Sequence, residues 1–146
     1  MTVIERKRRP EAAAPENVAR LRVRYAETDQ MGVAYYGNYF TWFEVARVEW
    51  CKAAGFNYRD MEELDGALLV VAEATCRYRA AARFDDELAI RTFVTKARSR
   101  MVAFGYEVRK VETGELLATG ETSHLITGPD MKLRTLPEKY RAMFGL

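Results

Sequence analysis

The chain has 146 residues, of which 49% are hydrophobic and 30% are charged, and its formal net charge is +2. This length fits one domain that can bury a core without disulfides, and the composition is typical of a soluble globular protein. No stretch approaches the roughly 20 apolar residues of a membrane span, and no apolar run follows the charged N-terminus as in a secretory signal. We therefore predict a cytoplasmic protein.

The charge is concentrated at the N-terminus. Residues 1–15 contain four basic and two acidic side chains, so the remaining residues carry 19 of each sign. Residues 1–17 are expected to form a flexible basic tail, and residues 18–146 a single domain. Solubilisation is a better reading of the tail than phosphate binding, because a Pro-, Ala- and Glu-rich stretch buries little surface. No nucleic-acid partner is expected for the folded part.

Metal and redox chemistry find few ligands in the sequence. There are two cysteines, without a CxxC spacing, and His124 is the one histidine of the chain. Cys51 and Cys76 are read as reduced thiols, and His124 as a structural residue, since no carboxylate partner is evident beside it. We expect neither a metal site nor a cofactor.

The domain opens with a predicted strand and a loop that leads into a long helix. Alternate apolar residues from Ala19 to Tyr25 have the period of a half-buried strand. The polar segment 27–32 is predicted to be a loop. A helix is expected over residues 38–54, because Asn38 suits its start and Gly55 suits the left-handed residue beyond its end.

The predicted helix is apolar on several sides, which indicates that it is enclosed rather than laid on a surface. One stripe alone would cover a single face, but further apolar residues occupy much of the remaining circumference. The stripe comprises Tyr39, Phe43, Ala46 and Trp50, and the additional residues are Phe40, Trp42, Val45 and Val48.

Four more strands are predicted after the helix, within residues 67–78, 88–95, 102–108 and 116–127, and a short helix follows at 137–144. One long helix and a run of strands indicate an α+β fold, in which a curved antiparallel sheet wraps the helix. Long strands in a small sheet leave an open edge, which favours a homodimer.

The loop before the helix carries two carboxylates, Glu27 and Asp29, and two glycines that allow close backbone approach. A helix N-terminus offers free N–H groups for a developing oxyanion, and a nearby carboxylate can attack a carbonyl or activate water. On physical grounds alone, Asp29 is more often a cap or turn residue.

The full string of residues 25–39, YAETDQMGVAYYGNY, resembles the active-site signature of the 4-hydroxybenzoyl-CoA thioesterase and YbgC-type acyl-CoA thioesterase family. The resemblance covers residues 21–144. The matched positions are Thr28, Asp29, Gly32, Val33, Tyr35, Asn38 and Tyr39.

This resemblance implies a hotdog fold, with a five-stranded antiparallel sheet around one long helix and assembly into dimers or homotetramers. It implies hydrolysis of an acyl-CoA thioester, with Asp29 as nucleophile or general base and the backbone N–H of Tyr36 polarising the carbonyl. Gly37 and Asn38 are expected to contact the substrate. The chain departs from YbgC-type members, which usually carry histidine where Tyr36 stands.

The coenzyme A phosphates are expected to meet Arg98 and Arg100, in a tight connection between two strands; Ser99 departs from the family pattern there. An exposed basic hairpin is the equal alternative. Glu44 and Arg47, three residues apart on the helix, are interpreted as a supporting pair.

Two other hotdog functions are alternatives to a thioesterase. A hotdog dehydratase would need a histidine in the loop, and none occurs before His124. A non-catalytic module that binds acyl-CoA or acyl-carrier protein is the stronger alternative, because fold does not determine function. Acyl length and aromaticity stay open.

Overall fold

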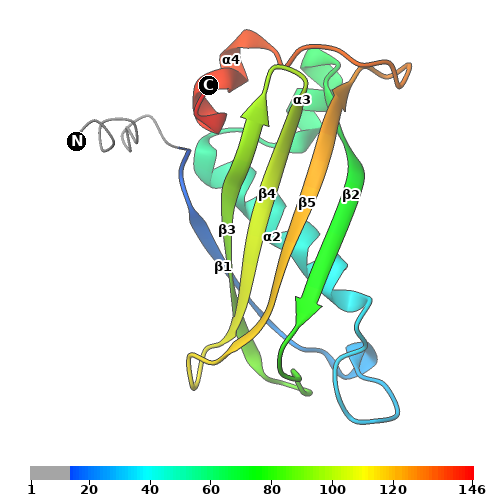
Figure 1. Ribbon diagram of the computed structural model, residues 1–146, viewed down its shortest axis with the longest axis vertical. Coiled ribbons are helices and arrows are strands. Elements are labelled where there is room, and N and C mark those ends of the chain that lie inside the picture. The colour runs from blue at the N-terminus through cyan, green and yellow to red at the C-terminus, as the bar shows by residue number, and fades with distance from the viewer. Residues whose placement is uncertain (1–13) are drawn as a thin grey trace, which may run out of the picture.

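The computed structural model describes residues 14–146. One antiparallel sheet carries five strands in the order β1-β3-β4-β5-β2, and the long helix α2 crosses one of its faces (Figure 1). The predicted α+β architecture with five strands is confirmed. The strands are β1 (Asn17–Arg22), β2 (Leu68–Tyr78), β3 (Glu87–Arg98), β4 (Met101–Lys110) and β5 (Leu116–Thr127).

Helix α2 (Asn38–Ala54) has the predicted bounds. It ends at Gly55, whose φ of 108° lets its N–H return to the carbonyls of Cys51 and Lys52. The helix lies close to the sheet because Gly120 has no side chain: a Cβ there would lie 2.4 Å from the ring of Phe43.

The sheet of a single chain covers α2 on one side only. Its buried residues include Trp42, Phe43 and Trp50, whereas Phe40 and Val45 keep 38% and 42% of their surface exposed. The predicted enclosure is therefore incomplete within one chain, and apolar helix surface remains for another partner.

Three elements differ from the sequence prediction. The first strand ends at Arg22, and a 3₁₀ turn, η2 (Tyr25–Glu27), replaces its predicted end. Helix α3 (Tyr58–Asp65) was not predicted, although Asn57 caps it by accepting the N–H of Asp60. The C-terminal helix is split into α4 (Glu138–Arg141) and η3 (Ala142–Phe144).

The expected pair of Glu44 and Arg47 is wrong, because Arg47 points into the core while Glu44 is exposed. Arg47 is 8% exposed, and its guanidinium donates to the hydroxyls of Tyr58 and Tyr106, at 3.0 and 3.1 Å. A buried cation needs hydrogen-bond acceptors for its N–H groups, and here two neutral phenol oxygens supply them.

Most of the expected tail, residues 1–17, lies outside the described residues. Its last part belongs to the domain, since β1 begins at Asn17 and the Glu16 carboxylate pairs with Arg91 at 2.8 Å. The carbonyl of Pro15 accepts the indole N–H of Trp50 at 2.7 Å. No helix within residues 14–146 is long and apolar enough to cross a bilayer.

Candidate active site

The loop between η2 and α2 folds back on itself and docks against the connection that follows β2. The N–H of Asp29 donates to the carbonyl of Val33 at 2.9 Å, and Gly32 takes a φ of 83° at the turn. The N–H of Ala34 donates to the carbonyl of Ala82 at 2.8 Å. These bonds place Asp29 beside the end of β2.

The Asp29 carboxylate faces a cleft of about 330 Å³. Its Oδ1 accepts the N–H of Met31 at 2.9 Å, and Oδ2 accepts no hydrogen bond from residues 14–146. One carboxylate oxygen is therefore free to act in the cleft. Most residues that line the cleft are tyrosines or alanines, and the lining includes Tyr36, Tyr39, Tyr78, Arg79 and Ala80.

Two backbone donors stand open at the start of α2. The carbonyl of Tyr35 accepts the N–H of Asn38 at 3.0 Å, and the carbonyl of Tyr36 accepts that of Tyr39 at 3.2 Å. In a trans peptide the N–H points opposite to the carbonyl, so the N–H groups of Tyr36 and Gly37 point away from the helix. Neither donates to an acceptor among the described residues.

Glu27 is buried under the loop and does not line the cleft. Glu27 is 6% exposed, and its carboxylate accepts from the Arg24 backbone N–H at 2.8 Å and from the Trp42 indole at 3.1 Å. Burial alone would raise the pKa of Glu27, but these bonds outweigh it, and the pKa is lowered. Its carbonyl accepts from the N–H of Tyr35 and from Asn38 Nδ2, both at 2.8 Å.

This arrangement gives Asn38 a definite contact. Its amide holds the loop to the helix, so its nitrogen is already occupied, and substrate contact by Asn38 stays a prediction. Gly37 lies at the turn itself, where a Cβ would come within 2.9 Å of the Tyr35 ring. A larger residue there would have to displace the exposed Tyr35 ring.

The structure does not bring Arg98 and Arg100 to Asp29 within one chain. Asp29 lies beside the end of β2, at the end of the sheet where β3 begins, whereas Arg98 ends β3 and pairs with Met101 at the hairpin. Twelve residues of strand span roughly 36 Å. Figure 1 shows the hairpin and the Asp29 loop at opposite ends of the sheet.

His124 is also outside the site. It is 1% exposed, and its Nε2 lies 2.8 Å from the hydroxyl of Thr122. Burial, followed by the charge of Arg47, lowers the pKa of His124 to about 4, so the ring is neutral near pH 7. The structural reading of this histidine is consistent with this environment.

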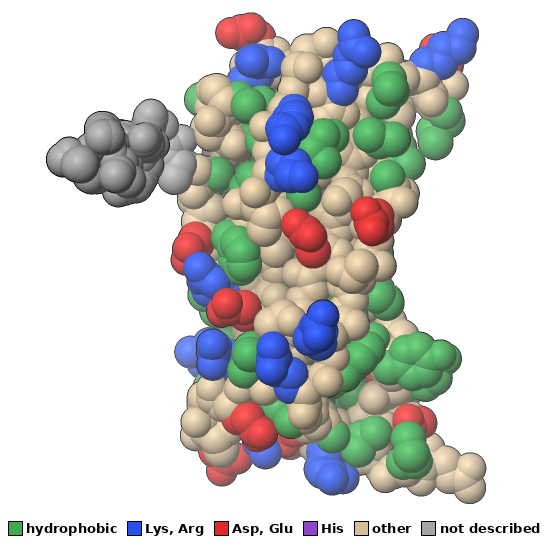
Figure 2. All heavy atoms as spheres, in the orientation of Figure 1, with side chains coloured by type: hydrophobic (Ala, Val, Ile, Leu, Met, Phe, Trp, Pro, Cys, Tyr) green, Lys and Arg blue, Asp and Glu red, His purple; other side chains and the backbone are tan. Residues whose placement is uncertain are grey.

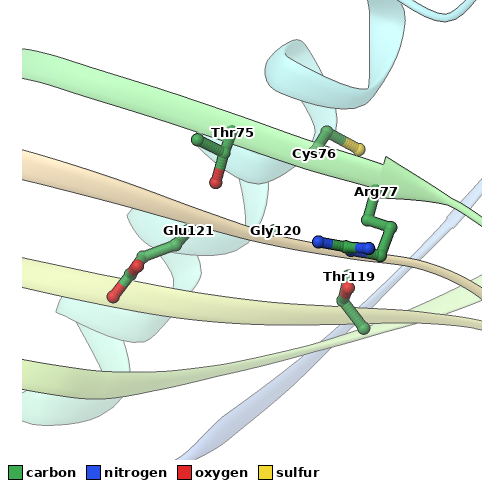
Figure 3. A pocket seen from close by; sticks show the side chains of 6 residues that line it. All are labelled: Thr75, Cys76, Arg77, Thr119, Gly120 and Glu121. Atoms are coloured by element: carbon green, nitrogen blue, oxygen red, sulfur yellow. The ribbon is translucent and has the colours of Figure 1, made fainter.

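A second hollow, of about 340 Å³, lies on the face of the sheet away from α2 (Figure 3). Thr119 and Glu121 flank Gly120, which faces the helix, so their side chains point outward. Glu121 accepts the hydroxyl of Thr95 at 2.7 Å, and Arg77 stands beside Thr119. The carboxylate of this hollow, Glu121, is already engaged by Thr95, which makes the hollow a poorer candidate than the cleft.

Sequence reasoning located Asp29 and Tyr36 in one place but missed the anchors around them. Glu27 was named without a definite role, and Tyr78, whose hydroxyl donates to the carbonyl of Tyr36 at 3.0 Å, was not singled out. Within residues 14–146, no group of three or more His, Cys, Asp or Glu side chains could hold a metal ion.

Comparisons with known proteins place the chain among related proteins of one family. The sequence profile described as Thioesterase superfamily matches residues 31–117. The acyl-CoA thioester hydrolase YbgC of Escherichia coli O6:H1 is 33% identical over 85% of this chain and 92% of its own. A DHNA-CoA thioesterase structure from Staphylococcus aureus superposes with a TM-score of 0.82 at 35% identity, over 87% of each chain. The structure of the protein TT1821 from Thermus thermophilus, at 39% identity, gives 0.81 over 88% of this chain and 95% of that one.

Proposed function

The chain belongs to the thioesterase superfamily, and we propose that it hydrolyses an acyl-CoA thioester to a free acid and CoA through Asp29 and the N–H of Tyr36. The observation that carries this proposal is the pairing of a half-free carboxylate with unoccupied backbone donors in one cleft. The free carboxylate oxygen can attack the carbonyl or act as a base, and a free backbone N–H can stabilise charge on the thioester oxygen.

The reaction can follow either of two courses at Asp29. As a base, the carboxylate takes a proton from water, hydroxide adds to the carbonyl, and the CoA thiolate leaves and recovers the proton. As a nucleophile, its oxygen forms a mixed anhydride with loss of CoA, and water then cleaves the anhydride. In both courses the N–H of Tyr36 stabilises negative charge on the thioester oxygen.

A homodimer paired through β2 fits the exposed surface. β2 is an edge strand of eleven residues, and its Val71 and Tyr78 are 49% and 43% exposed. Figure 2 shows apolar side chains beside the lower end of this strand. Antiparallel pairing with a second copy would cover the edge, as unpaired strand edges require.

This dimer also explains the distant arginines. Antiparallel pairing about a two-fold axis sets the hairpin end of one subunit beside the Asp29 end of its partner. Arg98 and Arg100 would then serve the partner's site, where they bind CoA phosphates.

The activity is tested by measuring free thiol release from short, long and aromatic acyl-CoA thioesters, without added metal or nucleotide. We expect hydrolysis of at least one class. Tight CoA binding without hydrolysis of any of them would instead support the non-catalytic binding module.

The shared site is tested by mixing Asp29→Asn protein with an Arg98→Ala, Arg100→Ala double variant and allowing subunits to exchange. About a quarter of the sites would then be intact in a random mixture of dimers. Recovery of activity above that of both parents, at low substrate concentration, is the expected result. No recovery, with exchange verified, would place these arginines outside the site.

A further inference from the structure

Tyr78 links the edge strand to the catalytic loop. It is the last residue of β2, it lines the cleft, and its hydroxyl donates to the carbonyl of Tyr36 at 3.0 Å. Its ring packs edge-on against Tyr39, with centroids 5.0 Å apart, and against Tyr36, at 6.2 Å. Burial and the neighbouring Cys76 raise the pKa of Tyr78, so the hydroxyl keeps its proton and can donate.

The carbonyl that Tyr78 holds belongs to the peptide that also carries the N–H of Gly37. A peptide is planar, so fixing its carbonyl fixes the opposite direction of this N–H. The preceding peptide, with the N–H of Tyr36, is joined to it at one Cα. Rotation of the held peptide would therefore also disturb the donor that faces the thioester oxygen.

The loop has few other side-chain anchors at this point. Tyr35 and Tyr36 are 47% and 61% exposed, and α2 has no side-chain cap on its N-terminus. Among the described residues, the Tyr78 hydroxyl is the side-chain donor to the backbone carbonyls of residues 35–37. Their other donors are backbone N–H groups of the first turn of α2, at 3.0–3.3 Å.

We propose that Tyr78 is a positioning residue, which orients the Tyr36 and Gly37 peptides so that their N–H groups meet the thioester oxygen. This inference rests on the proposed thioesterase function. Tyr78 acts through the backbone rather than on the reacting atoms. Its contribution should therefore increase as charge develops on the oxygen, and affect turnover more than binding.

The kinetic test is Tyr78→Phe, which removes the hydroxyl and keeps the ring packing. We expect kcat to fall about 3–10-fold, the loss that one ordinary hydrogen bond gives, with KM changed less than about twofold. Tyr25→Phe is the matched control, because the Tyr25 hydroxyl has no hydrogen-bond partner within residues 14–146 and its ring packs on Phe84. The control should keep the parental kcat.

A spectroscopic test separates orientation from general damage. Infrared spectra of a ¹³C-labelled thioester bound to Asp29→Asn protein report hydrogen bonding at the carbonyl as a shift to lower frequency. The Asp29→Asn, Tyr78→Phe double variant should bind the thioester with a smaller shift. A merely structural role would lower the melting temperature and leave this frequency unchanged.

The proposal is overturned if Tyr78→Phe retains both the parental kcat and the parental carbonyl frequency. Failure of the proposed function gives a different result, since the parent protein would then release no thiol from any acyl-CoA. In that event, amide hydrogen exchange of Asn38 and Tyr39 in the unliganded protein decides the matter, because their N–H groups donate to the carbonyls of Tyr35 and Tyr36. Faster exchange in Tyr78→Phe supports the positioning role, and unchanged exchange refutes it.

Discussion

The start and the middle of α2 treat their polar groups in opposite ways. At the start, Asp29 and Tyr36 line the cleft, one oxygen of Asp29 accepts no hydrogen bond, and the N–H groups of Tyr36 and Gly37 have no acceptor within residues 14–146. In the middle, Arg47 is buried and hydrogen-bonded to two tyrosines. From one of them, Tyr106, a chain of hydrogen bonds runs through Thr122 to His124. Groups left open can bind a substrate, whereas groups bonded to each other hold the fold together.

The contrast has a physical cause in burial. An unbonded polar group in the core costs free energy, and water removes that cost at an open cleft. Among described side chains, only Thr92 Oγ1 and His124 Nδ1 are buried without a partner. Nearly all buried polar side chains within residues 14–146 are therefore bonded, whereas Asp29 Oδ2 and the N–H of Tyr36 are left without a partner at the cleft.

The largest expected effect is at the open end. Asp29→Asn keeps the shape but removes the charge, so kcat should fall by about 10²–10⁴-fold, while acyl-CoA still binds. Single-turnover hydrolysis beside calorimetric binding measures both quantities. The matched control is Glu27→Gln, which should reduce kcat less than about tenfold, because Glu27 anchors the loop. If Asp29→Asn keeps most of its kcat, the nucleophile-or-base assignment is wrong.

The reverse result is expected in the middle of the helix. Arg47→Leu leaves the hydroxyls of Tyr58 and Tyr106 without their donor, so the free energy of unfolding should fall by about 2–4 kcal/mol. The kcat of the folded protein should stay within about twofold. Denaturant unfolding measures the first, with Glu44→Gln as an exposed control on the same helix. A large loss of kcat at unchanged stability would show that the two regions are not separate.

The two regions also differ in how much the sequence revealed. The bounds of α2 and the loop around Asp29 followed from local signals, such as Asn38, Gly55 and the string of residues 25–39. The partners of Arg47 did not, because Tyr58 and Tyr106 lie 11 and 59 positions away and only the folded chain brings them close. The helical spacing of three residues instead suggested Glu44 as the partner of Arg47.

The same limit explains the missed details of the site. The bond from Tyr78 to Tyr36 joins residues 42 positions apart, and no local pattern encodes it. Helix α3 was missed because eight residues give little periodicity, although Asn57 and Gly66 mark its ends. The proposed role of Arg98 and Arg100 in a partner's site depends on how two copies pair, which no local pattern of one chain encodes.

A smaller effect of pH should separate the regions further. The pKa of His124 is lowered from 6.5 to about 4 by burial, so the folded protein keeps this ring neutral. Below pH 6.5 this histidine binds a proton in the unfolded chain but not in the folded one. Protonation therefore stabilises the unfolded state, and the free energy of unfolding falls progressively down to about pH 4. The loss should be roughly 2–3 kcal/mol, from the size of the pKa shift.

The pH effect is measured by denaturant unfolding of the parent and of His124→Gln at a series of pH values. Carboxylates such as Glu27, whose pKa is also lowered, add a further loss below about pH 4.5 in both proteins. The difference between the two curves therefore isolates His124. Parallel curves between pH 6.5 and 4.5 would show that this ring does not titrate as its environment predicts.

The smallest effect is expected at the far end of α2, where Trp50 is fully buried and its indole N–H reaches the carbonyl of Pro15. A deletion of residues 1–13 keeps this acceptor, whereas a deletion of residues 1–15 removes it. The longer deletion should lower the free energy of unfolding by about 1 kcal/mol relative to the shorter one, the usual contribution of one hydrogen bond. Both should retain kcat, because the bond lies at the end of α2 opposite to Asp29. Thermal unfolding of the two proteins at equal concentration makes the comparison. Equal stability would show that water replaces the Pro15 carbonyl at no cost, and a loss of kcat in the longer deletion alone would show that this end of the helix also supports the site.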